Sequence, residues 1–434
     1  MKRWIRAVSL MAVAWMISFP GQAELTIRIT QGTEAALPIA VLPLAWTGQE
    51  APPAEDVAAI IRSDLARSGR FKPLNEWPET PSTVDEVRYP VWRSMGADSL
   101  VLGQVRPTAS GQYEVDVQLL DVFQGTRLER YTNLVDADEL RDVAHYYSDL
   151  IYQRLTGEPG LFDSQIAYIT QQREADGPRY ALMVADSDGE RPKRALRSYA
   201  PIMSPAWSPD GNRLAYVTFE ADRADVYVQD LAGQRQVDSS FPGINGAPVW
   251  SPDGRRLALT LSKDGNPEIY LVDVSTRQLR RLTQNSAIDT EPAWLPDGSG
   301  LVFTSDRGGS PQLYQMPVQG GVAERLTFEG DYNAAATVSP DGRKIAMVHR
   351  TDGDYRIAVI DRDTKLLTVL TRGRLDESPS FAPNGSMILY AAKSGGVDVL
   401  EAVSVDGGFR QQLQLNQGQV REPAWSPLRL SLIH

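Results

Sequence analysis

The side chains that most often perform acid–base, nucleophilic or metal chemistry are sparse in this sequence. The chain of 434 residues has no cysteine and only three histidines, His145, His349 and His434, which lie far apart. It contains no Gly-x-Ser-x-Gly or His-Glu-x-x-His motif, and the absence of cysteine excludes thiolate zinc sites and thiol catalysis. We expect His145 and His349 to be packing or surface residues, and we predict a protein that is not an enzyme and has no cofactor or metal centre.

Two short acidic runs, at residues 186–189 and 352–354, superficially resemble calcium-binding loops. A calcium loop needs a longer ordered series of oxygen ligands that ends in an acid, and neither run supplies one. We therefore interpret both runs as hairpin turns.

The composition indicates a globular protein rich in turns, and it narrows the choice of partners. The chain is 42% hydrophobic and 23% charged, with 34 glycines and 29 prolines. Its formal net charge of −11 means that it lacks the basic excess with which proteins bind nucleic-acid phosphates. We expect a largely β-stranded protein that does not bind nucleic acid.

Residues 1–23 have the pattern of a secretory signal peptide. A basic start, MKRWIR, precedes the apolar run AVSLMAVAWMISF, and the small residues Gly21 and Ala23 lie where a cleavage site requires them. The apolar run is shorter than the roughly 20 residues that span a bilayer, and no other run approaches that length. The sequence therefore predicts cleavage between Ala23 and Glu24 and export without a membrane-spanning segment.

A six-fold internal repeat governs the second part of the chain. The copies AWSPDG, VWSPDG, AWLPDG, TVSPDG, SFAPNG and AWSPLR place their prolines 43 or 44 residues apart, from Pro209 to Pro427. This period is typical of a propeller blade with four strands. The last copy has no strands after it, whereas residues 165–198 supply three strands without a copy before them. We therefore predict a six-bladed β-propeller over residues 161–434, closed by pairing of the C-terminal strand with the first blade.

Each Ser-Pro-Asp-Gly sequence predicts a tight type I turn, because proline presets φ at the second position and glycine closes the turn. A large apolar side chain precedes the turn in every copy: Trp207, Trp250, Trp294, Val338, Phe381 and Trp425. We expect these side chains to pack between adjacent blades.

Residues 24–160 do not follow the repeat, and their pattern predicts a small N-terminal α/β domain. In order, the expected elements are a strand in PIAVLPLAW, helices over 54–69 and 83–96, strands over 98–108, 112–122 and 126–135, and a helix over 136–157. Pro90 lies inside the second helix and disfavours its continuity.

The alternating direction of the strands assigns the loops to two faces of the ring. The Ser-Pro-Asp-Gly turns share one face, and the longer, more varied loops just upstream of each first strand share the other, which we call the loop face. Binding sites usually lie in loops on a rigid scaffold. Five acidic residues are expected around the central opening of this face: Asp289, Glu291, Asp376, Glu377 and Glu422. Binding of a small ligand or a cation in this acidic funnel is the alternative to binding of a protein partner.

From the signal peptide to Pro427 the sequence resembles the TolB family of the Tol-Pal system of Gram-negative bacteria. The most specific stretches are ELTIRITQG with PIAVLP, MSPAWSPDGNRLAYVTFE, NGAPVWSPDG, DTEPAWLPDG, LVFTSD before RGGSPQLY, and LDESPSFAPNG. The resemblance implies a periplasmic, non-enzymatic adaptor that links the outer-membrane lipoprotein Pal with inner-membrane TolA. It also implies a role in outer-membrane integrity and in invagination of the outer membrane at cell division. We expect the chain to be a monomer.

The resemblance implies that Pal binds the loop face. The matching positions are Ile244, Asn245, Gly246, Ala247, Thr290 and Glu291, and the same face carries Met203, Ser204, Asp289, Asn333, Asp376, Glu377 and Glu422. Ile244 departs from the family pattern, which has a histidine at that position. These thirteen residues form the predicted Pal-binding set.

The resemblance also implies that TolA contacts the mature N-terminus. The matching segment consists of Glu24, Leu25, Thr26, Ile27, Arg28, Ile29 and Thr30. Its alternation of apolar and polar residues suits a strand that adds to the edge of a partner's sheet. It equally suits an ordinary first strand of the N-terminal domain. The resemblance implies that the segment switches between docked and free forms and that Pal binding favours the docked form.

Overall fold

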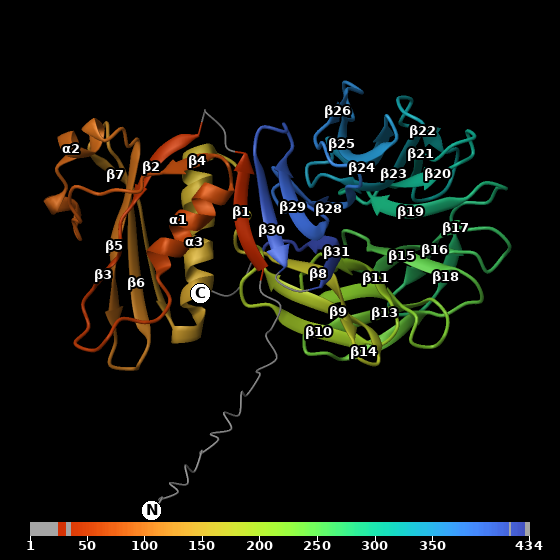
Figure 1. Cartoon of the computed structure of the whole chain (residues 1–434), viewed down its shortest axis with the longest axis horizontal. Helices are drawn as coiled ribbons and strands as arrows, with labels where there is room; N and C mark the ends of the chain where they lie inside the picture. The colour runs from red at the N-terminus through yellow and green to blue at the C-terminus, as the bar shows by residue number, and fades with distance from the viewer. Residues whose placement is uncertain (1–24, 32–35, 416–417, 430–434) are drawn as a thin grey trace, which may run out of the picture.

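The computed structural model describes residues 25–31, 36–415 and 418–429. Figure 1 shows two bodies side by side, a small α/β domain and a larger ring of β-sheets. The predicted signal peptide and its cleavage site between Ala23 and Glu24 lie outside the described residues. Among the described residues, no helix has both the length and the apolar character needed to cross a membrane.

The N-terminal domain is one mixed sheet with helices on both faces. Its elements are β2 (Leu37–Val41), β3 (Ala45–Trp46), α1 (Val57–Arg67), β4 (Phe71–Pro73), η1 (Val84–Glu86), α2 (Tyr89–Ser94), β5 (Ser99–Pro107), β6 (Tyr113–Asp121), β7 (Thr126–Val135), η2 (Ala137–Glu139) and α3 (Leu140–Thr156). The strand order is β4-β2-β5-β6-β7, and β3 also pairs with β5. Alternate residues of β2 and β5 point to opposite faces, so Ile39 and Val101 pack with α1 and α3, whereas Ala40 and Leu100 pack with α2.

The two helices that border the propeller end as their sequences predict. The Asp56 carboxylate accepts the Ala59 N–H at 3.0 Å at the start of α1, and Gly69 follows the helix with a φ of 71°. The α3 helix ends at Gly157, whose φ is 77°. The single helix expected over residues 83–96 is wrong, because η1 and α2 are separate elements and Arg88 between them has a non-helical backbone. Pro90 explains the break, since proline is tolerated only in the first turn of a helix.

The ring is a six-bladed β-propeller, as predicted. In blade order, its strands are β8 (Gln165–Glu174), β9 (Gly177–Asp186) and β10 (Lys193–Ser198); β11 (Ile202–Trp207), β12 (Arg213–Thr218), β13 (Asp225–Asp230) and β14 (Arg235–Ser239); β15 (Asn245–Trp250), β16 (Arg256–Leu261), β17 (Glu268–Asp273) and β18 (Leu279–Arg281); β19 (Asp289–Trp294), β20 (Gly300–Ser305), β21 (Gln312–Pro317) and β22 (Glu324–Arg325); β23 (Tyr332–Val338), β24 (Lys344–Thr351), β25 (Asp354–Asp361) and β26 (Leu367–Val369); β27 (Glu377–Phe381), β28 (Met387–Ser394), β29 (Val397–Ser404) and β30 (Arg410–Leu415). The last strand, β31 (Gln419–Trp425), pairs antiparallel with β8 and completes the first blade. The predicted closure of the ring by the C-terminal strand is therefore confirmed.

The repeated turn and its preceding tryptophan serve the architecture of the ring. In the first copy the Gly211 N–H donates to the Ser208 carbonyl at 2.9 Å and closes the turn. The indole N–H of Trp207 donates to the carbonyl of Ala424 in the preceding blade at 3.1 Å, and that of Trp250 donates to Ala206 at 3.2 Å. Both tryptophans are buried. The expected packing between blades is confirmed, and the indoles of Trp207 and Trp250 also hydrogen-bond to the preceding blade.

Replacing Trp207 by phenylalanine is expected to lower the free energy of unfolding by about 1–3 kcal/mol, because it leaves the buried Ala424 carbonyl without its indole donor. Equilibrium denaturation in urea measures the change. An unchanged unfolding free energy would show that this bond between the first two blades contributes no stability.

The N-terminal strand β1 (Leu25–Gln31) lies apart from the N-terminal domain's sheet. It pairs antiparallel with β30, from Leu25 opposite Leu415 to Gln31 opposite Arg410, and forms a fifth, outermost strand on the last blade. Figure 1 shows this strand in red beside the blue β30. The interpretation of residues 24–30 as a first strand of the N-terminal domain is therefore wrong. Without β1, β30 would be the outer strand of its four-stranded blade, so β1 covers that edge.

Candidate partner-binding face

A cavity of about 490 Å³ opens at the centre of the loop face, where the first strands of all six blades meet. We call it the central funnel. Three acidic residues, Glu291, Glu377 and Glu422, line it together with Arg421. Its charged lining is therefore net acidic, which favours a partner that presents a basic group.

Six residues in the funnel wall share an unusual backbone conformation. Their φ values lie in the left-handed region: Ser204 (51°), Ala247 (47°), Glu291 (52°), Ala335 (53°), Ser378 (55°) and Glu422 (48°). Each occupies the same place in its blade, within an irregularity of the first strand's pairing. None is glycine, so each position stores on the order of 1–2 kcal/mol of strain, and such strain is concentrated at functional sites.

Two of these strained residues tie neighbouring blades together through their side chains. The Glu422 carboxylate accepts the backbone N–H of Ser204 at 2.5 Å, and burial raises the pKa of that carboxyl. The Glu291 carboxylate accepts the Ala335 N–H at 2.8 Å and the Thr304 hydroxyl at 2.9 Å. The third funnel carboxylate, of Glu377, is exposed. Two funnel acids thus have a structural role, and one faces solvent.

Four members of the predicted set lie beneath the surface of the loop face. They are Asn245, Asp289, Asn333 and Asp376, each two residues before a strained position and each at most 2% exposed. Asp289 pairs with Arg307 at 2.7 Å, and Asp376 accepts the Gly373 N–H at 3.2 Å, while burial raises the pKa of the Asp376 carboxyl. The expectation that five acids surround the opening is therefore wrong for Asp289 and Asp376, because their carboxylates are buried and bonded within their own blades.

The two asparagines stabilise the equivalent loops that precede β15 and β23. The Asn245 amide oxygen accepts the Phe241 N–H at 3.0 Å, and the Asn333 amide nitrogen donates to the Glu329 carbonyl at 2.8 Å. His349, which is 4% exposed, lies 2.8 Å from the Asn333 amide oxygen, and burial lowers the pKa of its imidazole. These buried side chains shape the loops and leave contact to the exposed residues above them.

The remaining members of the set surround or line the funnel. Met203, Ser204, Ala247, Glu291, Glu377 and Glu422 line it, Ile244 is 49% exposed, and Gly246 and Thr290 are partly exposed. Thr290 lies on β19 and its hydroxyl is 3.2 Å from that of Thr260.

Large apolar side chains of the loop face are exposed to solvent, and only two of them, Met203 and Ile244, belong to the predicted Pal-binding set. We call this set the apolar rim: Tyr199 (73% exposed), Met203 (41%), Ile244 (49%), Ile288 (47%), Phe328 (74%) and Leu375 (44%). Exposed apolar groups beside polar ones are typical of protein interaction surfaces. A sequence signal existed, because residues 244, 288 and 375 are apolar and each lies four positions before the proline of its blade's first strand.

A smaller cavity of about 280 Å³ adjoins the funnel and shares Glu291 and Glu377 with it. The rings of Tyr332 and Tyr355 lie in its wall, edge to face with centroids 5.4 Å apart, beside Leu375. It can receive an apolar side chain next to two carboxylates.

Comparisons with known proteins are consistent along the chain. Residues 25–128 match the family model described as TolB amino-terminal domain, and residues 152–429 match the one described as TolB beta propeller domain. The chain is 55% identical over 423 residues to a Tol-Pal system protein TolB of Thioalkalivibrio sulfidiphilus, which covers 96% of this chain and 97% of that one. It is 56% identical over 430 residues to the protein of that name in Nitrosococcus oceani, covering 98% and 99%. A crystal structure of TolB from Acinetobacter baumannii, 44% identical, superposes with a TM-score of 0.86 over 93% of this chain and 100% of that one.

Proposed function

Because the chain belongs to the TolB family of the Tol-Pal system, we propose that it is a non-enzymatic periplasmic adaptor that links the lipoprotein Pal with TolA. In this proposal residues 1–23 direct export and are removed, and the adaptor supports outer-membrane integrity and invagination of the outer membrane at cell division. The observation that supports it most is the loop face, where an acidic funnel and an apolar rim lie together on a rigid ring.

Pal docks on the loop face in this proposal. The apolar rim supplies the area whose removal from water drives association, and the smaller cavity beside Tyr332 supplies a pocket for an anchoring side chain. The funnel carboxylates select a partner that places a basic group over the opening. The strained first strands hold these groups in a fixed arrangement, which reduces the ordering cost of binding.

TolA binds the N-terminal segment, Glu24 to Thr30, in the same proposal. Within the described residues β1 is the outermost strand of its sheet, so its backbone can pair with another strand on its free side or, once released from β30, on both sides. The Pal and TolA surfaces are thus separate parts of the chain.

Recovery of both partners from a periplasmic extract with the tagged mature chain tests the proposed function. We expect Pal and TolA to co-purify with it. Recovery of neither protein would overturn the adaptor assignment.

Charge reversal at the funnel, Glu291→Lys, is expected to weaken Pal binding by at least about tenfold, which corresponds to about 1.4 kcal/mol. The lysine repels a basic group and also breaks the bonds to Ala335 and Thr304. Isothermal titration calorimetry measures the affinity, and thermal unfolding verifies the fold.

Two further variants make this prediction sharper. Glu377→Lys reverses an exposed funnel charge that forms no side-chain hydrogen bond or ion pair with any other described residue, and it should weaken Pal binding at an unchanged melting temperature. Glu324→Lys reverses an exposed charge at the start of β22, on the face opposite the loop face, where the Ser-Pro-Asp-Gly turns lie. This variant should bind Pal normally. Equal effects of Glu377→Lys and Glu324→Lys would refute a role for the funnel.

A further inference from the structure

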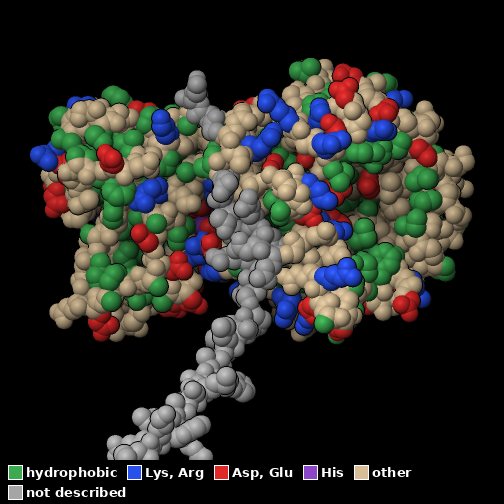
Figure 2. Space-filling model, in the orientation of Figure 1, with side chains coloured by type: hydrophobic (Ala, Val, Ile, Leu, Met, Phe, Trp, Pro, Cys, Tyr) green, Lys and Arg blue, Asp and Glu red, His purple; other side chains and the backbone are tan. Residues whose placement is uncertain are grey.

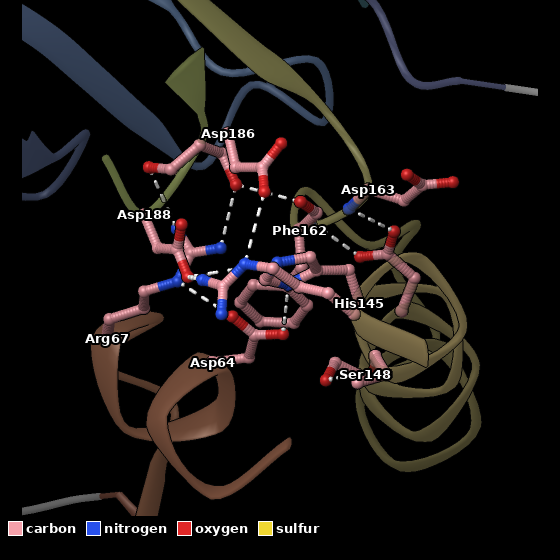
Figure 3. Close-up of polar contacts among 12 residues, drawn as sticks. Asp64, Arg67, His145, Ser148, Phe162, Asp163, Asp186 and Asp188 are labelled. Atoms are coloured by element: carbon pink, nitrogen blue, oxygen red, sulfur yellow. Dashed lines mark hydrogen bonds and ion pairs between the residues drawn. The ribbon is translucent and has the colours of Figure 1, made fainter. Parts of the chain in front are cut away.

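The boundary between the two domains contains a buried histidine between two carboxylates, shown in Figure 3. His145 on α3 is 0% exposed. Its Nδ1 lies 2.7 Å from an Asp64 oxygen on α1, and its Nε2 faces an Asp188 oxygen at 3.7 Å. Asp64 belongs to the N-terminal domain and Asp188 to the turn between β9 and β10 of the propeller. The imidazole therefore lies between acidic groups of both domains. The sequence pattern indicates only a packing or surface residue at His145 and a turn at residues 186–189.

Arginines from the N-terminal domain cross the same boundary. Arg67 on α1 donates to Asp64 at 3.0 Å and to the Ser187 hydroxyl at 2.8 Å, and Arg141 on α3 donates to Asp186 at 3.2 Å and also to Asp188. Charged side chains of both signs gather where the two domains meet (Figure 2).

The surroundings of His145 include charged groups from every element packed against it. They are Asp64 and Arg67 on α1; Arg141, Asp142 and Asp149 on α3; Asp163 before β8; Asp186, Asp188 and Arg191 on and after β9; and Arg429 after β31. Arg191 bonds to Asp142 and Asp186, and Arg429 bonds to Asp163 at 2.8 Å and Asp142 at 3.1 Å. The three groups Asp64, His145 and Asp188 converge closely enough to share an ion. Arg67 and Arg141 already neutralise both carboxylates, however, so the local field opposes a metal cation.

Nδ1 of His145 is within hydrogen-bond distance of Asp64, and Nε2, which has no hydrogen-bond partner among the described residues, lies within ion-pair distance of Asp188, so the imidazole attracts both carboxylates only when it carries two protons. Burial alone lowers the pKa of His145, but Asp64 and Asp188 outweigh it, and the pKa is raised from its ordinary value of 6.5. The pKa of Asp64 is lowered from 3.8. Burial by itself raises this pKa, but the positive charges of His145 and Arg67 lower it by more than burial raises it.

A second, half-buried acid, Asp149, lies one turn further along α3. The Asp149 carboxylate accepts the N–H groups of Phe162 at 2.7 Å and Asp163 at 2.9 Å, in the segment that enters the propeller. Burial raises the pKa of Asp149 from 3.8 to about 7. His145 and Asp149 therefore both hold a proton more tightly in the closed junction than in water.

We propose that the domain junction is a proton-dependent clamp, in which His145 with two protons holds Asp64 of one domain against Asp188 of the other. A raised histidine pKa contributes stability that is complete below pH 6.5 and is lost as the pH rises through the raised value. The raised pKa of Asp149 acts in the same direction, because the junction loses stability as the pH rises from 3.8 to about 7 and this carboxyl loses its proton. The lowered pKa of Asp64 acts at the acid end, where its contribution is lost as the pH falls below 3.8. The clamp is thus closed at mildly acidic pH and loosens toward alkaline pH.

Hydrogen exchange of the full mature chain at pH 6 and pH 9 tests the clamp. After correction for intrinsic rates, amides of α1 and of the β9–β10 turn should exchange severalfold faster at pH 9, because the raised pKa of His145 couples loss of its second proton to opening of the junction. His145→Gln should abolish most of this change. The control His349→Gln, at a buried histidine within one propeller blade, should retain it.

Asp188→Asn is the second variant, in case His145→Gln does not fold. It removes only the propeller's carboxylate from the pair and should reduce the pH-dependent change in exchange. Wild-type exchange at the junction that does not change between pH 6 and pH 9, or equal pH dependence in wild type, His145→Gln and Asp188→Asn, would overturn the clamp.

Discussion

A chain that lacks residues 419–434 is expected to lose the cooperative unfolding of its propeller. The deleted β31 pairs with β8 from Gln419 opposite Gln171 to Trp425 opposite Ile166, and it is the strand that closes the ring. Trp425 is 7% exposed and its indole N–H donates to the Ser164 hydroxyl at 2.9 Å, so its loss alone costs about 3–5 kcal/mol. A whole domain is stable by only about 5–15 kcal/mol, so the truncated ring has little stability left.

The deletion also removes bonds to the next blade. The Ala424 carbonyl accepts the Trp207 indole N–H, and the Glu422 carboxylate accepts the Ser204 N–H. Thermal unfolding followed by circular dichroism measures the effect, with a chain that ends at Arg429 as the control. A truncated protein with the melting temperature and single transition of the control would show that ring closure does not determine stability.

Deletion of residues 24–30 is expected to abolish TolA binding and to leave Pal binding intact or stronger. The deletion removes β1, whose backbone pairs with β30 and is the segment proposed to pair with TolA. It leaves the funnel and the apolar rim unchanged, since all their residues lie between Tyr199 and Pro423.

Surface plasmon resonance with purified TolA and Pal measures both affinities on the same protein, and Pal binding is the internal control for folding. Normal TolA affinity after the deletion would refute the assignment of the N-terminal segment. Loss of both affinities would instead indicate that β1 is needed for the ring itself.

The propeller was predictable because the sequence that specifies each blade recurs at a regular interval along the chain. Prolines 43 or 44 residues apart specify one blade per repeat, and the unmatched strands at the two ends of the array specify the closure that β31 makes with β8. The small domain's helices were predictable from local signals such as Asp56 and Gly69. The break before Pro90 follows from the same local chemistry.

Other features depend on contacts that a local pattern cannot identify. The alternation of residues 25–30 specifies a strand but does not choose between sheet edges, and its partner β30 lies at the far end of the chain. The strained funnel residues are not glycines, so the usual sequence sign of a positive φ is missing. Asp289 and Glu291 both precede the same proline. The strand pairing is irregular between Thr290 and Ala293, and as a result Asp289 is buried whereas Glu291 lines the funnel. Asp64, His145 and Asp188 come from three separate elements, so only the folded chain brings them together.

Calorimetric titration of the Pal periplasmic domain into the mature chain tests the adaptor role most directly. We expect saturable binding at a single site, weakened by at least about tenfold in Glu291→Lys and retained after deletion of residues 24–30. No measurable binding to the wild-type chain, or equal affinity for the wild type and Glu291→Lys, would contradict docking of Pal on the loop face.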